Sequence, residues 1–232
     1  MESRRANKLV IAGEKPLYNI AEAARFLGIP SSTVRTWVQG RKSPHSQSNK
    51  YAPVIKVAAD EGPYRISFNN LIELYVLRTL RRKHDVKLPD IRRALDYAEQ
   101  KLGIERLLIH PELKTDGGNL FIEHYGKLIS LNRSGQIALK ELLRNALMRV
   151  EWENDLPSNL YLPIPERAER KSVSVNPLIS YGLPAVHGVE TKIIAARVDA
   201  GEEAADLAED YGIPLDDVID AIVFEGTLAR AA

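Results

Sequence analysis

A helical period of hydrophobic positions appears early in the chain, where residues 17–40 read "LYNIAEAARFLGIPSSTVRTWVQG". A first helix is predicted from one apolar face made by Ile20, Ala23, Ala24 and Leu27. Gly28 follows as a residue that adopts positive φ without strain. Pro30 opens a second helix, with Ser31 or Ser32 placed to cap its free N–H groups. Two short helices that cross at a glycine are typical of a helix-turn-helix.

Two short extended segments are predicted next, after the polar, turn-rich residues 40–52. They cover 53–57 and 64–68, joined by "AADEGP", and together predict a hairpin of the kind called a wing. Helical periodicity returns over residues 69–83 and 89–102, with Asn69 or Asn70 as the first cap and Gly103 closing the second helix.

The middle of the chain alternates short apolar segments with turns. Strands are predicted at 107–109, 120–123 and 128–131, with a tight turn at "DGG" (116–118), and a helix over 134–152. Residues 153–172 contain three prolines and are predicted to form a linker or an extended arm. After a strand and turn, three helices are predicted near residues 190–200, 203–211 and 215–225.

The expected fold class is mainly α with small antiparallel β elements. It combines an N-terminal winged helix-turn-helix with a C-terminal trihelical, helix-turn-helix-like domain. The predicted domains are the winged helix-turn-helix (1–103), a middle α/β segment (104–152), a linker or arm (153–172) and an acidic trihelical domain (173–232).

The helix-turn-helix pattern occurs twice. With Gly28 in the turn, a small residue lies four positions before it, and the buried offsets hold Leu27, Ile29, Val34 and Trp37. With Gly212 in the turn, the same offsets return Ala208, Tyr211, Ile213, Val218 and Ala221. Both turns contain "GIP". The spacing of apolar residues therefore does not tell which copy contacts DNA.

Charge separates the two copies. Residues 1–110 carry 20 Lys and Arg against 11 Asp and Glu, whereas residues 111–232 carry 12 against 20. The first copy has no acidic residue from Ala23 to Ala59, while Asp216, Asp217 and Asp220 lie on the second helix of the other copy. Phosphates at one charge per ~1.7 Å of DNA axis would repel those acids. We therefore expect the first copy to bind DNA and the second to pack or contact protein.

The residues expected to contact DNA are donors on the second helix of the first copy and basic residues just after it. They are Ser31, Ser32, Thr33, Arg35, Thr36, Gln39, Arg41, Lys42 and Lys50. The simpler alternative is a helix pair that only packs against the core, with a basic surface that is solvated and binds nothing.

Other chemistry finds little support in the sequence. There is no cysteine, and the five histidines show no metal-binding spacing, so we expect no metal, no cofactor and no enzyme activity. Neither a secretion signal nor an apolar run of membrane-spanning length is present. These features lead us to expect a cytoplasmic protein that does not enter membranes.

The N-terminal part resembles a known family. "YNIAEAARFLGIPSSTVRTWVQG", the predicted wing and "LPDIRRALDYAEQKLG" are similar to the winged helix-turn-helix of MerR-like regulators, over roughly residues 16–103. Such regulators continue into a long antiparallel dimerisation helix and an effector site, often with cysteines. This chain has neither feature.

The C-terminal part resembles a different family. The pattern of a strand, "NP", "GLPAVHG", a helix, "AGEEAADLAEDYG" and a final helix, over residues 173–225, is similar to the small trihelical domain of VapB-type antitoxins. Gly188, Val189 and Glu190 stand where that family usually has Gly-Thr-Arg. The two resemblances together imply an antitoxin that binds a PIN-domain (VapC-like) ribonuclease toxin and represses its own operon, as a homodimer.

A PIN-type nuclease, as the resemblance implies, holds its metal with clustered carboxylates. An inhibitor is expected to offer a cation and an apolar arm to such a site. The arm candidates are Leu160, Leu162, Ile164, Arg167, Arg170 and Lys171. Either Arg167 or Arg170 would reach the metal site of the toxin. The alternative is that this segment is only a solvated linker that does not contact a toxin.

Three functions stay open at this point. The first is the DNA-binding antitoxin. The second is a stand-alone MerR-like transcription regulator whose middle segment binds a small-molecule or protein effector. The third is a scaffold in which the first helix-turn-helix only packs.

Overall fold

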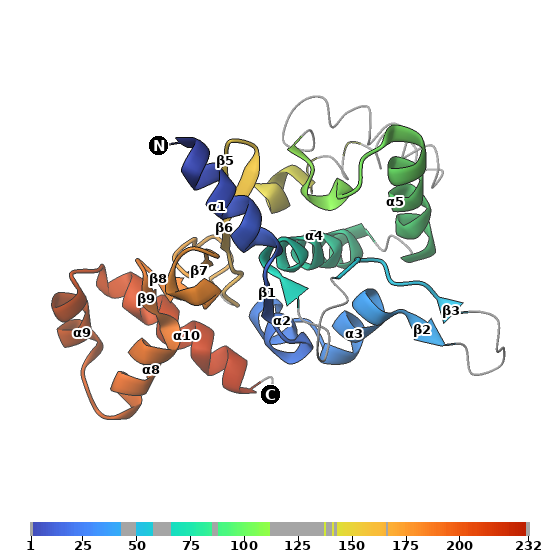
Figure 1. Cartoon of the computed structure of the whole chain (residues 1–232). Coiled ribbons are helices and arrows are strands. Elements are labelled where there is room, and N and C mark those ends of the chain that lie inside the picture. Colours follow the sequence, from blue (N-terminus) through green and yellow to red (C-terminus); the bar gives the residue numbers. More distant parts are fainter. Residues whose placement is uncertain are drawn as a thin grey trace.

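The computed structural model has a helical N-terminal half and a C-terminal half in which a small sheet carries three helices (Figure 1). It describes residues 2–42, 50–57, 66–84, 88–111, 137, 141, 143–165 and 167–230. The fold class is the expected one, mainly α with small antiparallel sheets and an N-terminal helix-turn-helix.

The N-terminal half is arranged around one long helix, α4. Its elements are α1 (Glu2–Glu14), β1 (Pro16–Tyr18), α2 (Ile20–Leu27), α3 (Ser31–Gln39), β2 (Arg41–Lys42), β3 (Lys50–Tyr51), β4 (Ile66–Ser67), α4 (Phe68–His84), α5 (Leu88–Leu102) and the 3₁₀ turn η1 (Leu107–Ile109). The buried side of α4 carries Phe68, Leu71, Ile72, Leu74 and Leu77. Helices α1 and α2 and the turn η1 pack on α4, so this helix supports the helix-turn-helix from behind.

The hairpin lies elsewhere than predicted. Strand β2 pairs antiparallel with β3, with Arg41 opposite Tyr51, whereas β4 pairs with β1. Residues 53–57 are not a strand, because the N–H groups of Val54 and Ile55 donate to the carbonyl oxygen of Trp37, at 2.7 and 3.1 Å. Those donors are then unavailable for a ladder. The loop that was expected to be irregular therefore contains the hairpin. Residues 64 and 65 of the expected second strand lie outside the described residues.

Three further expectations were wrong in detail. Residues 107–109 form a 3₁₀ turn instead of a strand, because the N–H groups of Ile109 and His110 donate to the carbonyl oxygens three residues earlier, at 3.2 and 3.1 Å. The helix expected to reach residue 152 ends at 147, and the chain turns into strand β5 from Val150. The cap of α4 is Ser67 and not Asn69 or Asn70, since the Ser67 Oγ accepts from the Asn70 N–H at 3.1 Å. The strands expected at 120–123 and 128–131 and the turn at 116–118 lie outside the described residues.

The C-terminal half is built on a five-stranded antiparallel sheet in the order β5-β6-β7-β8-β9. Its elements are β5 (Val150–Glu153), β6 (Leu156–Tyr161), β7 (Ser174–Val175), the 3₁₀ turn η3 (Ser180–Gly182), β8 (Ala185–Val186), β9 (Val189–Glu190), α8 (Thr191–Asp199), α9 (Ala204–Tyr211) and α10 (Leu215–Arg230). The three predicted C-terminal helices are confirmed, and α10 is longer than expected. Within the described residues, no helix is long and apolar enough to cross a membrane.

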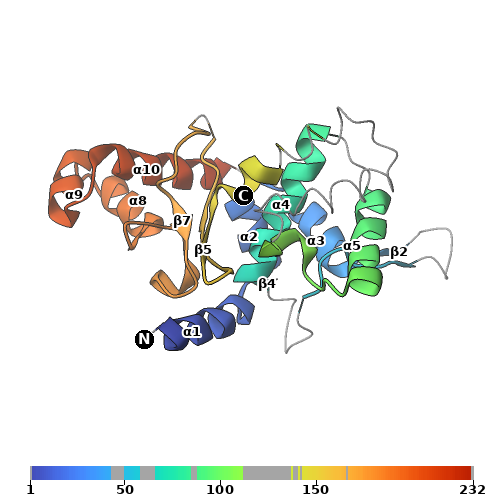
Figure 2. The same ribbon diagram turned by 90° about the horizontal axis from the view of Figure 1, so that it is seen from above.

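The two halves contact each other along the sheet, which lies between helices α8–α10 and the N-terminal helices (Figure 2). Helix α1, which the sequence did not lead us to expect, packs on both β6 and α4. Its Arg5 forms an ion pair with Glu153 at 2.8 Å, and its Leu9 is buried. On the same side, the buried Tyr18 hydroxyl donates to the carbonyl oxygen of Gly182 at 2.8 Å.

Candidate nucleic-acid interface

The α2–α3 pair has the geometry of a helix-turn-helix. Asn19 opens α2 with a capping box: its Oδ1 accepts from the Glu22 N–H at 2.9 Å, and its own N–H donates to Glu22 Oε2 at 2.8 Å. Gly28 closes α2 at φ 59°, and the Ile29 N–H donates back to the Ala24 carbonyl at 2.9 Å. The left-handed conformation of Gly28 ends α2 and redirects the chain towards α3, which begins at Ser31. A residue with a side chain at position 28 would be strained in this conformation.

The start of α3 differs from the expectation. The N-cap is Pro30, and no side chain caps the helix, so Ser31 and Ser32 are its first exposed residues and not its caps. The Pro30 carbonyl accepts from the N–H groups of Thr33 and Val34, at 2.9 and 3.2 Å. The N–H groups of Ser31 and Ser32 therefore have no partner within the helix. A helix start with free N–H groups and hydroxyls favours an anion such as phosphate.

The outer face of α3 carries the side chains expected to contact DNA. Arg35 is exposed and forms no ion pair with any residue that the structure describes. Thr33, Thr36 and Gln39 are half-buried. The Thr36 Oγ1 donates to the Ser32 carbonyl at 2.9 Å, so its hydroxyl remains available as an acceptor. The opposite face of the helix is buried through Val34, Trp37 and Val38.

The remaining expected DNA-binding residues follow α3 directly. Arg41 and Lys42 form β2 and Lys50 begins β3, so the hairpin starts one residue after the Gly40 that ends α3. The structure therefore brings all nine candidates onto two consecutive elements, a helix and the hairpin next to it (Figure 1). In helix-turn-helix proteins that bind DNA, the second helix of the pair lies in the major groove.

The α9–α10 pair repeats the same backbone geometry. Gly212 closes α9 at φ 63°, and the Ile213 N–H donates to the Ala208 carbonyl at 3.0 Å. The Pro214 carbonyl accepts from the N–H groups of Asp217 and Val218, at 2.9 and 3.2 Å. The backbone contacts around the two turns thus agree within 0.1 Å, bond by bond.

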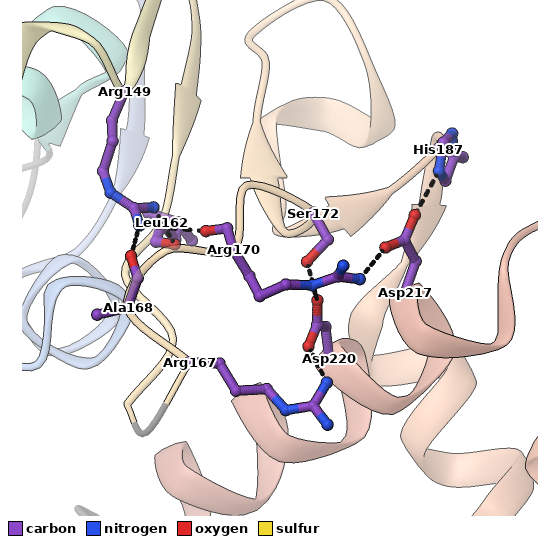
Figure 3. Close-up of polar contacts among 9 residues, drawn as sticks. All are labelled: Arg149, Leu162, Arg167, Ala168, Arg170, Ser172, His187, Asp217 and Asp220. Atoms are coloured by element: carbon purple, nitrogen blue, oxygen red, sulfur yellow. Dashed lines mark hydrogen bonds and ion pairs between the residues drawn. The ribbon is translucent and has the colours of Figure 1, made fainter.

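The outer face of α10 binds the chain itself (Figure 3). Asp220 has no exposed surface and receives Arg167 Nη1, Arg170 Nε and the Ser172 hydroxyl, each at 2.6 Å. Asp217 receives Arg170 Nη2 at 2.5 Å and His187 Nε2 at 2.8 Å. Burial raises the pKa of Asp220, but the hydrogen bonds from Ser172 and the two arginines outweigh burial and hold this pKa below its usual value.

The segment expected to form a free arm is packed within the fold. Leu160, Leu162 and Ile164 are buried, the first as part of β6. The Arg149 guanidinium donates to the carbonyl oxygens of Leu162, at 3.2 Å, and of Arg170, at 3.1 Å, and also to that of Ala168. The Lys171 ammonium donates to the Met148 carbonyl at 2.9 Å. Contact of these residues with a toxin stays a prediction.

Sequence reasoning missed the pairing between this segment and α10. The signal was present in the opposite charges of 167–171 and 216–220, but the sequence offers nothing that places two segments about 50 residues apart side by side. Among the described residues, no group of three or more His, Asp or Glu side chains is placed to hold a metal ion.

Comparison with known proteins agrees with this geometry. A family model described as "Putative DNA-binding HTH domain" matches residues 16–95, which run from the start of β1 into α5. "Putative antitoxin VapB45" of Mycobacterium tuberculosis is 29% identical over 234 residues, covering 93% of this chain and 96% of that protein. "Uncharacterized protein Rv2308" of the same organism is 26% identical over 220 residues, covering 90% of each chain.

The fold also agrees with a solved structure. The crystal structure of Rv2018 from Mycobacterium tuberculosis superposes with a TM-score of 0.69 at 26% identity, covering 90% of this chain and 98% of that one. The chain thus has an N-terminal helix-turn-helix domain that matches a DNA-binding family, and it shares its fold over most of its length with Rv2018.

Proposed function

We propose that this protein is a DNA-binding antitoxin. It binds operator DNA through α3 and the β2–β3 hairpin, neutralises a PIN-domain ribonuclease by direct contact, and represses its own operon as a homodimer. The observation that carries the proposal is the contrast between the two helix-turn-helix copies. Only α3 has an outer face without acidic residues or ion pairs within the described chain, whereas the face of α10 is occupied by arginines of the chain itself.

The antitoxin part draws on the similarity to "Putative antitoxin VapB45" across nearly the whole chain. Arg167, Arg170 and Lys171 stay the candidates for toxin contact. In the free chain the carboxylates of Asp217 and Asp220 hold the two arginines. A toxin that used them would have to offer carboxylates that compete with these two, as a PIN-type metal site does.

DNA binding is tested with the full chain and a labelled duplex from upstream of its own gene. We expect affinity to fall steeply with salt, because each phosphate contact contributes a slope of about −0.9 in log K against log salt. Arg35→Ala should weaken binding about tenfold and reduce the slope by about one contact. Lys192→Ala removes the same charge from an exposed position on α8 and is the matched control.

Equal affinities of Arg35→Ala and Lys192→Ala, or binding that salt does not change, would contradict DNA contact through α3. The toxin is tested by co-expression with the neighbouring reading frame. A stable complex with a ribonuclease that loses activity in it supports the antitoxin. A homodimer that never retains a ribonuclease favours the stand-alone regulator instead.

A further inference from the structure

A cleft of about 340 Å³ opens between α4, α5, η1 and residues 53–56, away from the outer face of α3. Its apolar wall is made by Val54, Ile55, Leu95, Leu107 and Leu108. A volume of this size is within the range of sites for small molecules. Six of the twelve lining residues are charged, so the cleft combines this apolar wall with a strongly polar rim. None of the residues expected to bind DNA or toxin lines it.

The most deeply buried acidic group that lines the cleft is the carboxylate of Glu73. This side chain comes from α4 and is 7% exposed. Its Oε2 accepts from Asn70 Nδ2 at 2.9 Å, while Oε1 receives no hydrogen bond from any residue that the structure describes. Arg106 is the nearest cation, but its Nη1 lies 3.9 Å from Oε2, which is too far for a hydrogen bond.

The surroundings leave this carboxylate without enough compensation. Burial raises the pKa of Glu73 to about 7, although Arg106 and the hydrogen bond from Asn70 act in the opposite direction. Arg106 is also engaged elsewhere, since its Nη2 pairs with Glu14 at 3.1 Å. Arg106 Nη1 is itself buried without a hydrogen-bond partner among the described residues, so the pair is incompletely satisfied, and a donor that reached the Glu73 carboxylate from the cleft would lower the cost of burying its charge.

The charge around the cleft indicates the class of ligand. Lys56, at the rim, pairs with Glu99, whereas Asp96 and Glu105 form no ion pair with a described residue. The uncompensated charge is therefore negative. A metal ion does not fit, because no three potential ligands come together among the described residues. The remaining class is an organic cation with an apolar body.

We propose that this cleft binds a small apolar amine, whose ammonium group pairs with Glu73 and whose body packs on the wall formed by 53–55, Leu95 and η1, and that its binding changes the affinity of α3 for DNA.

A short path of hydrogen bonds connects the cleft to α3. The Asn70 Nδ2 donates both to Glu73 Oε2 and to the Lys56 carbonyl, the latter at 3.0 Å. Just before Lys56, the N–H groups of Val54 and Ile55 donate to the Trp37 carbonyl, in the last turn of α3. Residues 53–56 thus form one wall of the cleft and also hold the end of α3. A ligand that moves this segment shifts α3 and the neighbouring hairpin with it.

Amine binding is tested on the full chain by calorimetry, with benzylamine and cyclohexylmethylamine as probes and benzyl alcohol and cyclohexylmethanol as neutral analogues. Both amines should bind saturably, and the alcohols at least tenfold more weakly. Glu73→Gln should weaken amine binding at least tenfold and should fold, because it removes a buried charge. Glu209→Gln, at an exposed position on α9, is the control and should change nothing.

A second variant tests the shape of the cleft independently of the charge on Glu73. Leu95→Phe narrows the cleft without altering Glu73 and should also weaken both amines. The proposal is overturned if neither amine binds saturably, if the alcohols bind as tightly as the amines, or if Glu73→Gln binds both amines as the wild type does.

The effect on DNA rests on the proposed DNA-binding function, whereas amine binding does not. Saturating benzylamine should change operator affinity at least threefold in the wild type and leave Glu73→Gln unaffected. Amine binding with unchanged operator affinity would overturn the link to α3 and leave the site in place. A chain that binds amine but never DNA would instead contradict the proposed function.

Discussion

The two helix-turn-helix copies share a backbone and differ in what their second helices do. Both turns have a left-handed glycine and the same hydrogen bonds around it. Counted from those glycines, three polar positions on α3 correspond to three acids on α10: Ser32 to Asp216, Thr33 to Asp217 and Thr36 to Asp220. Asp217 and Asp220 bind arginines of the chain, whereas no ion pair with a described residue occupies the outer face of α3. Turn geometry therefore sets the fold of each copy, and the outer face sets its partner.

The largest expected effect is on the stability of the second copy. Asp220→Ala leaves Arg167 and Arg170 without their buried carboxylate and should lower the free energy of unfolding by about 3 kcal/mol. Thr36→Ala, at the corresponding position of the first copy, should cost about 0.5 kcal/mol. Urea unfolding of both variants measures the difference. If both variants lose a similar amount of unfolding free energy, the outer face of α10 contributes no more to stability than the outer face of α3.

A second contrast concerns pH. The pKa of Glu73, behind the first copy, is raised from 4.5 to about 7, so its contribution to stability is present below pH 4.5 and is lost as pH rises towards 7, by about 3 kcal/mol. The pKa of Asp220 is lowered, so its contribution to stability is present above its unfolded pKa of 3.8 and is lost at more acidic pH.

Glu73→Gln should therefore be more stable than the wild type at pH 8 and not at pH 4. Hydrogen exchange should show α4 loosened at high pH and α10 at low pH, and the same response in both helices would contradict this contrast.

The outer faces can also be exchanged. Ser32→Asp combined with Thr36→Asp gives α3 two of the acids found on α10. We expect operator affinity to fall by about 2 kcal/mol, roughly 30-fold, because two carboxylates face phosphates. Fluorescence anisotropy measures this loss, and Ser32→Asn combined with Thr36→Asn is the uncharged control. An affinity equal to that of the control would mean that charge on α3 does not decide DNA binding.

The smallest expected effect distinguishes the first helices of the two copies. Asn19→Ala removes a capping box from α2 and should cost about 1 kcal/mol. Glu203→Ala, at the N-cap of α9, should change little, because Glu203 makes no capping hydrogen bond. Thermal and urea unfolding compare the two variants, and equal costs would contradict the assigned caps.

Local signals in the sequence predicted both helix-turn-helix copies. Gly28 and Gly212, with apolar residues at fixed offsets, were sufficient because each pattern concerns residues adjacent in the chain. Strand pairing was predicted less well. Nothing local indicates that Ile66 pairs with Tyr18, and the apolar run 107–109 fits a strand as well as a 3₁₀ turn.

The candidate sites show the same limit. The face proposed to contact DNA could be named because its residues lie on one helix and the hairpin after it. The ion pairs of Arg167 and Arg170, and the cleft at Glu73, depend on segments that meet only in the folded chain. Glu73 looked like an ordinary polar position on α4, and its burial was not visible in the helical period.

Helix α1 changes how the chain can be divided. It precedes the range of the DNA-binding family model, which begins at residue 16, yet it packs on β6 of the C-terminal half as well as on α4. The helix-turn-helix domain therefore resembles an insertion between α1 and the sheet more than a module at the end of a chain. A fragment that ends after α5 would keep the contact of α1 with α4 but lose β6, which would uncover the side of α1 that faces the sheet.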